Sequence, residues 1–471
     1  MTATGSRHRA RSTTRGDRRY STEAMTDKTS NHQLSEMKCP VSLEDVDLFG
    51  AGAQEHWYEA YEILHRECPV RIIPGEGLGG GSDAYILTRY ADIARVVRDP
   101  ERFKPTLSFG IEAAQRSLRE AKAQGSDPEL PRELNAMVAS MATLRPTQEL
   151  YRAHRQELTD PWVGPGAKRH VAMITETVDA LIDEWVDDDQ VEFISQFARP
   201  LPQRVMARVL GFPLEDVSRL ALWGTAQVAP FVHGKGHRNV LSREELEEQA
   251  RILEGFADYV AEQVAQKRAK PDDDMISFLT QVTYQALDRK LTDAEIHGVV
   301  YAMVLGGLET TQYALEEQAQ LLCDDPALLG QLRRDRSKLR GFTEEAMRLR
   351  APTQGLSTRV TTRDEEFQGV RVPKGSLLHL RWGAGNVDAE EYECPHQIQL
   401  DRKRVTAHLT FSQGPRTCPG SGISRLEQTI AWDRLLDRIA SLEYAAGNDF
   451  LHQPGIMLGT LKLHLKFARA S

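Results

Sequence analysis

The chain has 471 residues, 40% of them hydrophobic, and a formal net charge of −9. This length can bury a large core and enclose a cofactor, and the composition excludes a disordered or fibrous chain. A nucleic-acid binder is disfavoured because such proteins usually carry a basic balance. No run of 18 apolar residues occurs, so we expect no membrane anchor.

The chain divides into two parts near position 38. Residues 1–38 are polar and lack apolar periodicity, so we expect a disordered N-terminal tail, whose basic stretch 7–19 is simply solvated. Apolar periodicity then continues to the C-terminal region without an internal repeat, and residues 39–471 are expected to form one domain with no fused redox domain.

Helical periodicity dominates residues 39–471, which predicts a mainly α fold with a small β-rich part. The longest pattern, 291–323, would give one helix of about 50 Å. Other helices are expected at residues 57–66, 173–186, 198–210 and 241–269. Expected strands are 70–73 and 84–88, joined as a hairpin, and 359–360, 367–370 and 377–380, which would form a second small sheet.

The glycine-rich stretch 75–82 superficially resembles a dinucleotide-binding loop. That motif needs a helix directly after the loop, so that the helix N-terminus meets the pyrophosphate. Here a strand follows instead. We therefore interpret the stretch as a hairpin tip.

Five cysteines occur, an odd number with wide spacing: Cys39, Cys68, Cys323, Cys394 and Cys418. This favours reduced thiols in a cytoplasmic protein over a disulfide framework. One cysteine could then be a metal ligand. Cys394-Pro-His396 lacks further ligands at zinc spacing, so zinc is not expected there.

Cys418 lies in the loop Phe411-Ser-Gln-Gly414-Pro-Arg416-Thr-Cys418-Pro-Gly420, directly before a predicted helix. Its glycines allow a tight loop whose backbone can approach a flat ligand. The positive helix end, backbone N–H groups and Arg416 would favour a thiolate. The alternative is a buried structural cysteine in a turn.

The middle of the long predicted helix contains Val304-Leu-Gly306-Gly307-Leu-Glu309-Thr310-Thr311. Adjacent glycines cost about 1 kcal/mol each relative to alanine. They would let a planar group lie against the helix, and the Thr310 hydroxyl could bond the Gly306 carbonyl and open a groove. A close helix–helix crossing is the alternative. A third motif pairs Glu345 with Arg348, three residues apart on a helix, and alone would indicate only an ion pair.

In this order, the three motifs resemble those of the cytochrome P450 superfamily, and the resemblance runs from about residue 40 to 471. Ala384-Gly-Asn386-Val-Asp388 and Leu400-Asp401-Arg402 also match. The resemblance implies the P450 fold, a large helical domain with a small β-rich subdomain, and bound haem b. It also implies monooxygenation, an oxidoreductase activity of the EC 1.14 class.

The resemblance assigns roles position by position. Cys418 would be the proximal iron ligand, and Glu309 and Thr310 the acid–alcohol pair that delivers protons to dioxygen. Arg359 and Arg416 would pair with the haem propionates, as would Gln148 and Arg152. The remaining expected haem-contacting residues are Gly306, Gly307, Phe411, Gly414, Gly420 and His408.

Two positions depart from the bacterial pattern. Pro419 stands where leucine is common and has no N–H to donate, and Arg416 stands where histidine is common. Neither change undermines ligation by Cys418. Glu345 and Arg348 would be structural and support the proximal side.

The implied reaction inserts one oxygen atom of O2 into a C–H bond of an apolar small organic molecule. Two electrons would come from NAD(P)H through a separate ferredoxin and its reductase, docking on the Cys418 side near Arg404 and Arg416. We expect a monomer. A peroxide-driven peroxygenase and a non-catalytic haem-binding protein remain as alternatives. Residues expected at the substrate pocket are Phe103, Leu107, Phe109, Met137, Met141, Leu144, Phe231, Val304 and Leu356.

Overall fold

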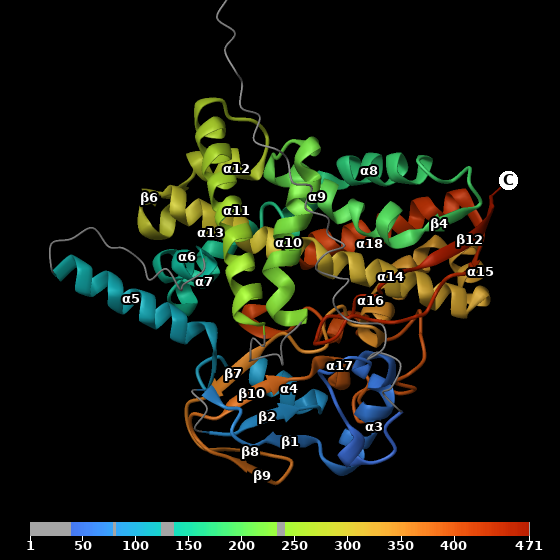
Figure 1. Cartoon of the computed structure of the whole chain (residues 1–471), viewed down its shortest axis with the longest axis horizontal. Helices are drawn as coiled ribbons and strands as arrows, with labels where there is room; N and C mark the ends of the chain where they lie inside the picture. The colour runs from blue at the N-terminus through green and yellow to red at the C-terminus, as the bar shows by residue number, and fades with distance from the viewer. Residues whose placement is uncertain (1–38, 79–81, 124–135, 233–240, 471) are drawn as a thin grey trace, which may run out of the picture.

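The computed structural model describes residues 39–78, 82–123, 136–232 and 241–470. The expected N-terminal tail therefore lies outside the described residues. Helices fill the upper part of the molecule in Figure 1, and a smaller region with most of the strands lies below them. The expectation of a mainly α architecture with a small β-rich part is confirmed.

The α-helices follow the sequence periodicity closely in most places. Among the described residues they are α3 (Trp57–Glu67), α4 (Tyr90–Arg98), α5 (Leu107–Ala123), α6 (Ala136–Leu144), α7 (Gln148–His154), α8 (Val171–Asp183), α9 (Pro200–Leu210), α10 (Val217–Val232), α11 (Arg243–Ala269), α12 (Met275–Gln281), α13 (Asp293–Gly307), α14 (Glu309–Asp324), α15 (Pro326–Arg334), α16 (Leu339–Leu349), α17 (Trp382–Gly385) and α18 (Ser421–Arg438).

The strands are short. They are β1 (Val70–Ile73), β2 (Ala84–Leu87), β3 (Phe103–Pro105), β4 (Gln190–Glu192), β5 (Thr283–Tyr284), β6 (Arg289–Lys290), β7 (Thr358–Thr361), β8 (Glu365–Phe367), β9 (Val370–Val372), β10 (Leu377–Leu380), β11 (Ile439–Tyr444) and β12 (His464–Arg469). The largest sheet has the order β1-β2-β10-β7-β3, and a second sheet has the order β11-β12-β4.

The predicted hairpin of β1 and β2 is present and antiparallel, with Val70 opposite Leu87. The predicted second sheet is wrong, because β10 and β7 join the hairpin in one five-stranded sheet. β10 pairs parallel to β2 with Leu377 opposite Ala84, an arrangement that connects segments almost 300 residues apart. Residues 367–370 belong instead to the separate β8–β9 pair. Local alternation identifies strands but not their partners, which tertiary packing selects.

The long helix predicted at 291–323 is two helices, α13 and α14, interrupted at Leu308. Thr292 caps α13 and forms a capping box with Glu295, which defines its start. Tandem glycines weaken the helix just before the break. The interruption lies inside the glycine motif, and it positions the site described below.

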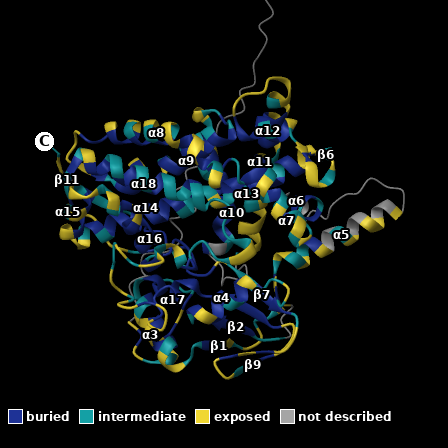
Figure 2. Ribbon diagram, turned by 180° about the vertical axis from the view of Figure 1, so that it is seen from behind, coloured by how far each residue is buried: buried dark blue, intermediate teal, exposed yellow. Residues whose placement is uncertain are grey.

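The main apolar core surrounds α13, α14 and α18 and contains Trp432, Phe197 and Phe342, all fully buried. Figure 2 shows buried positions concentrated along these helices and exposed positions on outer helices such as α5 and α8. No helix in the described ranges is long and apolar enough to cross a membrane. A smaller core fixes α4 against the five-stranded sheet and includes Phe103 and Leu409.

Candidate active site

Cys418 occupies the loop that leads into α18. Its amide donates to the carbonyl oxygen of Phe411 across 2.8 Å, and the Thr417 amide donates to the Gly414 carbonyl oxygen across 3.2 Å, so the loop closes on itself. Gly414 has a φ of +71°, which favours glycine, and an added Cβ would lie 2.9 Å from the Val97 carbonyl oxygen. These constraints fix the loop, and the Cys418 thiol lines a cavity.

Burial raises the pKa of the Cys418 thiol, whereas backbone N–H groups of Gly420 and Ser421 and the cations Arg155 and Arg425 lower it. Both amides follow the cysteine closely, at the start of α18, where the sequence predicts that backbone N–H groups favour the thiolate. Arg155 also fixes the loop, since its Nη1 donates to the Thr417 carbonyl oxygen across 2.5 Å. This arrangement suits a cysteine that loses its proton when its sulfur binds a metal ion.

The cavity measures about 550 Å³, and residues from the α13–α14 break line it together with the Cys418 loop. Gly306, Gly307 and Thr310 all belong to this lining. A Cβ added to Gly306 would meet nothing within 4 Å, whereas one added to Gly307 would meet Met206 at 3.0 Å. Gly306 therefore leaves open space in the cavity, and Gly307 permits close packing of α9.

Thr310 makes the predicted contact. Its Oγ1 donates to the carbonyl oxygen of Gly306 across 2.8 Å, beside the break at Leu308. Glu309 does not line the cavity. Its carboxylate accepts from the hydroxyl of Tyr313. Burial raises the pKa of Glu309, while hydrogen bonds from Tyr313 and Thr225 lower it. The acid and the alcohol are thus adjacent, but only the alcohol is at the cavity surface.

A cluster of three arginines forms one edge of the cavity: Arg145, Arg359 and Arg416. Burial lowers the pKa of Arg145 and of Arg359 to about 10, and that of Arg416 also falls. Within the described residues no carboxylate forms an ion pair with any of the three. The Tyr151 ring lies between two of them, 5.6 Å from the Arg145 guanidinium and 4.5 Å from that of Arg416. Arg359 is buried and the other two are half-buried, and cations withdrawn from water without counter-ions are costly, so this edge suits an anionic ligand.

The structure does not bring Arg152 to the cavity. It is exposed on α7, and Gln148, which is half-buried, is not part of the lining either. Tyr151 and His154, from the same helix, line the cavity instead. The inward face of the helix is therefore displaced from the predicted one. The apolar spacing from Tyr151 to the fully buried Leu158 was the signal that could have identified it.

His154 and Glu427 were not anticipated. Both line the cavity and are buried, and neither imidazole nitrogen of His154 has a hydrogen-bond partner in the described part of the chain. Burial, together with the nearby cations Arg145 and Arg155, lowers the pKa of His154 well below its ordinary value, which favours the neutral imidazole. Burial raises the pKa of Glu427 well above its ordinary value, which favours the protonated carboxyl.

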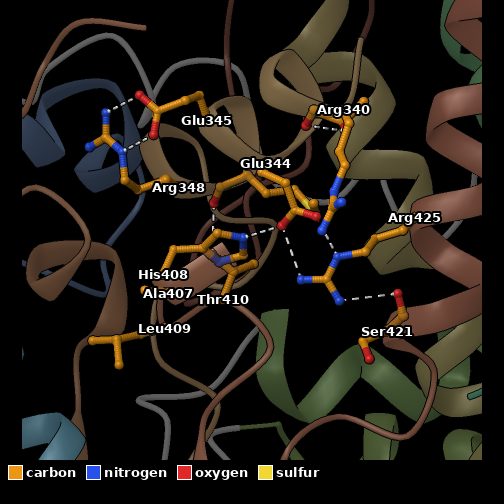
Figure 3. Close-up of polar contacts among 12 residues, drawn as sticks. Arg340, Glu344, Glu345, Arg348, Ala407, His408, Leu409, Thr410, Ser421 and Arg425 are labelled. Carbon is orange, nitrogen blue, oxygen red and sulfur yellow. Dashed lines mark hydrogen bonds and ion pairs between the residues drawn. The ribbon is translucent and has the colours of Figure 1, made fainter. Parts of the chain in front are cut away.

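His408 lies behind the Cys418 loop rather than in the cavity lining. Its Nε2 is 2.9 Å from Glu344 Oε2. Arg425 of α18 donates to both oxygens of Glu344, and its guanidinium lies 4.4 Å from the ring centre of Phe411. Figure 3 shows Glu344 between the His408 ring and Arg425. His408 thus contacts the cavity only indirectly: its ring packs against that of Phe411, with ring centres 5.9 Å apart, and Phe411 does line the cavity.

The Glu345–Arg348 pair is fully buried, with Nε and Oε1 2.7 Å apart, and Figure 3 shows it on the other side of α16 from Glu344. Arg402 adds a second cation 2.9 Å from Glu345. Arg348 also donates to the carbonyl oxygens of Asn386 and Pro395. This network joins α16 to the segment before the Cys418 loop, so the predicted pair is a buried structural element and not a surface ion pair.

The expected substrate-pocket residues are only partly brought together. Leu107, Met137, Met141 and Leu356 line the cavity. Phe109 is exposed, and the following three are packed in apolar cores instead: Phe103, Leu144 and Val304. The side chain of Phe231 lies outside the described residues. The cavity lining also includes the apolar residues Val228, Val299, Ala302, Met303, Leu305 and Met457.

The chain is similar to known proteins along most of its length. The family model described as Cytochrome P450 matches residues 239–467. Cytochrome P450 107B1 of Saccharopolyspora erythraea is 30% identical over 414 residues, which cover 87% of this chain and 94% of that protein. The 6-deoxyerythronolide B hydroxylase of the same organism is 26% identical over 405 residues, 83% of this chain and 91% of that protein.

The solved structure of the bacillaene polyketide synthase cytochrome P450 PksS from Bacillus subtilis 168 superposes with a TM-score of 0.73. Its sequence identity is 22%, and the match covers 89% of this chain and 98% of that chain. At this identity the likeness shows a common fold, which agrees with the helical part and the five-stranded sheet described above.

Proposed function

Because the chain belongs to the cytochrome P450 family and is therefore a haem-iron monooxygenase, we propose that it inserts one oxygen atom of O2 into a C–H bond of an apolar small organic molecule. The observation that supports this most directly is the position of Cys418 in the same cavity as Gly306 and Thr310. A thiol that belongs to a loop fixed by hydrogen bonds and that shares a cavity with an interrupted helix suits a planar metal cofactor.

The residues fit haem b. Cys418 would hold the iron, and backbone donors at Gly420 and Ser421 would stabilise its thiolate. The two haem propionates would form ion pairs with Arg145, Arg359 and Arg416, which line one edge of the cavity. Tyr151 lies between two of these cations and would share that role. Bound there, haem supplies the oxygen activation that no side chain provides.

Two residues at the helix interruption, Thr310 and Glu309, would deliver protons to the cavity. Thr310 would pass its hydroxyl proton into the cavity, and Gly306 O holds that hydroxyl in place between turnovers. Glu309 would restore the proton, because burial raises its pKa and so keeps it protonated nearer to neutral pH. The route from Glu309 to the cavity requires a rotation away from Tyr313, its partner in the structure.

The substrate would be apolar, because much of the cavity lining consists of aliphatic and methionine side chains. Methionines at 137, 141, 303 and 457 give this lining unbranched, adaptable surfaces. Such a wall excludes water and offers few polar anchors. A terpenoid, steroid, fatty acid or aromatic compound suits it.

Electrons would come from NAD(P)H through a separate ferredoxin-type protein and its reductase. Exposed cations lie near the Cys418 loop: Arg98 donates to Gln413 across 2.5 Å, and Lys403 and Arg404 lie on the preceding segment. They would steer an acidic partner. Arg416, which was expected to help, faces the cavity beside Tyr151 instead. The free thiols of all five cysteines support a cytoplasmic setting.

Product analysis with isotopic oxygen tests the proposal. The purified protein, a ferredoxin, its reductase and NADH are incubated under ¹⁸O2 with apolar candidates that shift the visible spectrum on binding. Incorporation of one ¹⁸O atom into product is expected. Product formed with H2O2 but never with the ferredoxin system would favour a peroxygenase, and binding without any product would favour a non-catalytic haem protein.

A further inference from the structure

A cysteine, a histidine and a glutamate converge at the start of the described chain, far along the sequence from Cys418. The donor atoms of Cys39, His56 and Glu59 all lie within 4.8 Å of one another. They belong to three consecutive pieces of structure: the segment before η1 (Leu43–Asp45), the end of η2 (Ala53–His56) and the first turn of α3. We propose that Cys39, His56 and Glu59 bind a zinc ion.

The ligand types suit this metal. Thiolate, imidazole and carboxylate are the side chains that Zn²⁺ takes, and thiolate disfavours Mg²⁺ and Ca²⁺. One thiolate and one carboxylate also balance the two charges of the ion. Tetrahedral coordination places neighbouring ligand atoms about 3.5 Å apart, so donors within 4.8 Å need to approach by no more than about 1.3 Å. The fourth position would be left to water.

Within the described residues, metal binding would break no strong hydrogen bond or ion pair of the three donor side chains. No hydrogen bond or ion pair joins them to one another, and the side chains of His56 and Glu59 bond no other described residue. The Cys39 thiol makes only a weak contact with the Pro40 carbonyl oxygen at 3.9 Å. Cys39 and Glu59 are exposed and His56 is half-buried, so an ion can reach the site from solvent.

The backbone around the site is independently fixed. His56 and Glu59 are three residues apart at the beginning of α3, which places them on one side of a single turn. On the other side, Asp45 accepts hydrogen bonds from the amides of Val41 and Ser42 at 3.2 and 2.9 Å, which holds the segment after Cys39. Zinc would therefore tie the Cys39 segment to α3 without refolding either.

Zinc content and zinc X-ray absorption of the haem-loaded protein test this site, because absorption at the zinc edge is not obscured by iron. Protein treated with a chelator and then dialysed against ZnCl2 should hold one zinc per chain, with one sulfur neighbour at about 2.3 Å. Cys39→Ser should remove that sulfur and weaken zinc binding by about 100-fold, and His56→Gln should weaken binding while the sulfur neighbour remains.

Cys394→Ser is the matched control, because Cys394 is also an exposed cysteine close to a histidine, His396. This variant should bind zinc like the parent. Cys39 and Cys394 are exposed and His56 is half-buried, and an unchanged haem spectrum verifies folding in each variant. Zinc retained undiminished by Cys39→Ser, a spectrum without a sulfur neighbour in the parent, or loss of sulfur in Cys394→Ser would overturn the proposal. None of these results bears on the oxygenase activity.

Discussion

The hydroxyl of Thr310 donates to the carbonyl oxygen of Gly306, four residues earlier, at the interruption between α13 and α14. The bond replaces the regular helical ladder at this point and directs the threonine to the cavity wall. A hydroxyl held by a single carbonyl can rotate to donate elsewhere. The helix break thus creates the proton donor that the proposed reaction needs.

Thr310→Ala tests this donor. The variant should lower productive turnover by about 10- to 1000-fold, because it removes the general acid at the cavity wall. NADH consumption should continue, so the ratio of product to NADH falls. Thr310→Ser is the control and should retain most of the parent ratio. An unchanged ratio in Thr310→Ala would contradict the assigned role.

The arginine edge predicts which cations retain haem. Arg416→Leu should speed haem loss by about 10- to 100-fold, since each hydrogen bond to a charged group contributes about 1.5–3 kcal/mol. Transfer of haem to an excess of a haem-free globin measures the rate without any turnover. Arg152→Leu is the matched control, because it makes the same change at an arginine that is exposed on α7 and lies outside the cavity lining. Equal rates of loss in the two variants would refute the assignment.

The buried pair of Glu345 and Arg348 predicts a large stability effect. Glu345→Gln should lower the free energy of unfolding by about 3–5 kcal/mol, because it leaves Arg348 and Arg402 buried without their counter-ion. Urea unfolding followed by haem absorbance and circular dichroism measures it. Glu247→Gln breaks the exposed pair with Arg243 and should change stability little. A small effect at position 345 would mean that the network is not structural.

Glu316 predicts a dependence of stability on pH. Burial raises the pKa of its carboxyl from 4.5 to about 8, so the native state keeps a proton that the unfolded state releases over this range. The free energy of unfolding of the parent protein should therefore fall, relative to that of Glu316→Gln, by up to about 1.4 kcal/mol per pH unit as the pH rises from 4.5 to 8. Below pH 4.5 the difference should be constant.

Thermal unfolding of the two proteins between pH 4.5 and 8 checks this slope. Exposed Glu254 of α11 provides the control, and Glu254→Gln should follow the parent at every pH. If the midpoint difference between the parent and Glu316→Gln did not grow with pH, the carboxyl at position 316 would be ionised in the native state.

Local chemistry made the centre of the site predictable. The glycines and cysteine of the 411–420 loop and the glycine pair before Thr310 each violate ordinary helix or turn preferences, and such violations mark functional positions. The structure places Cys418 and Thr310 at one cavity, as their motifs imply. The Glu345–Arg348 pair was equally visible, but its burial was not, because burial depends on what packs over a helix.

The arginine edge was less predictable, because it depends on helix rotation. Assigning Gln148 and Arg152 assumed a register that places Arg152 inward, whereas the packed face includes Tyr151. Arg145 comes from the end of α6 and Arg359 from β7, so no local pattern could unite them. The predicted second sheet was wrong for the same reason, since the pairing of β10 with β2 depends on tertiary contacts.

The proposed oxygenation depends most on iron ligation by the Cys418 sulfur, and the carbon monoxide spectrum of the reduced protein measures this ligation directly. The parent should give the strongly red-shifted absorption band that distinguishes thiolate-ligated haem, and Cys418→Ser should lose it. A parent spectrum without that band, or an unchanged spectrum in Cys418→Ser, would contradict the central claim.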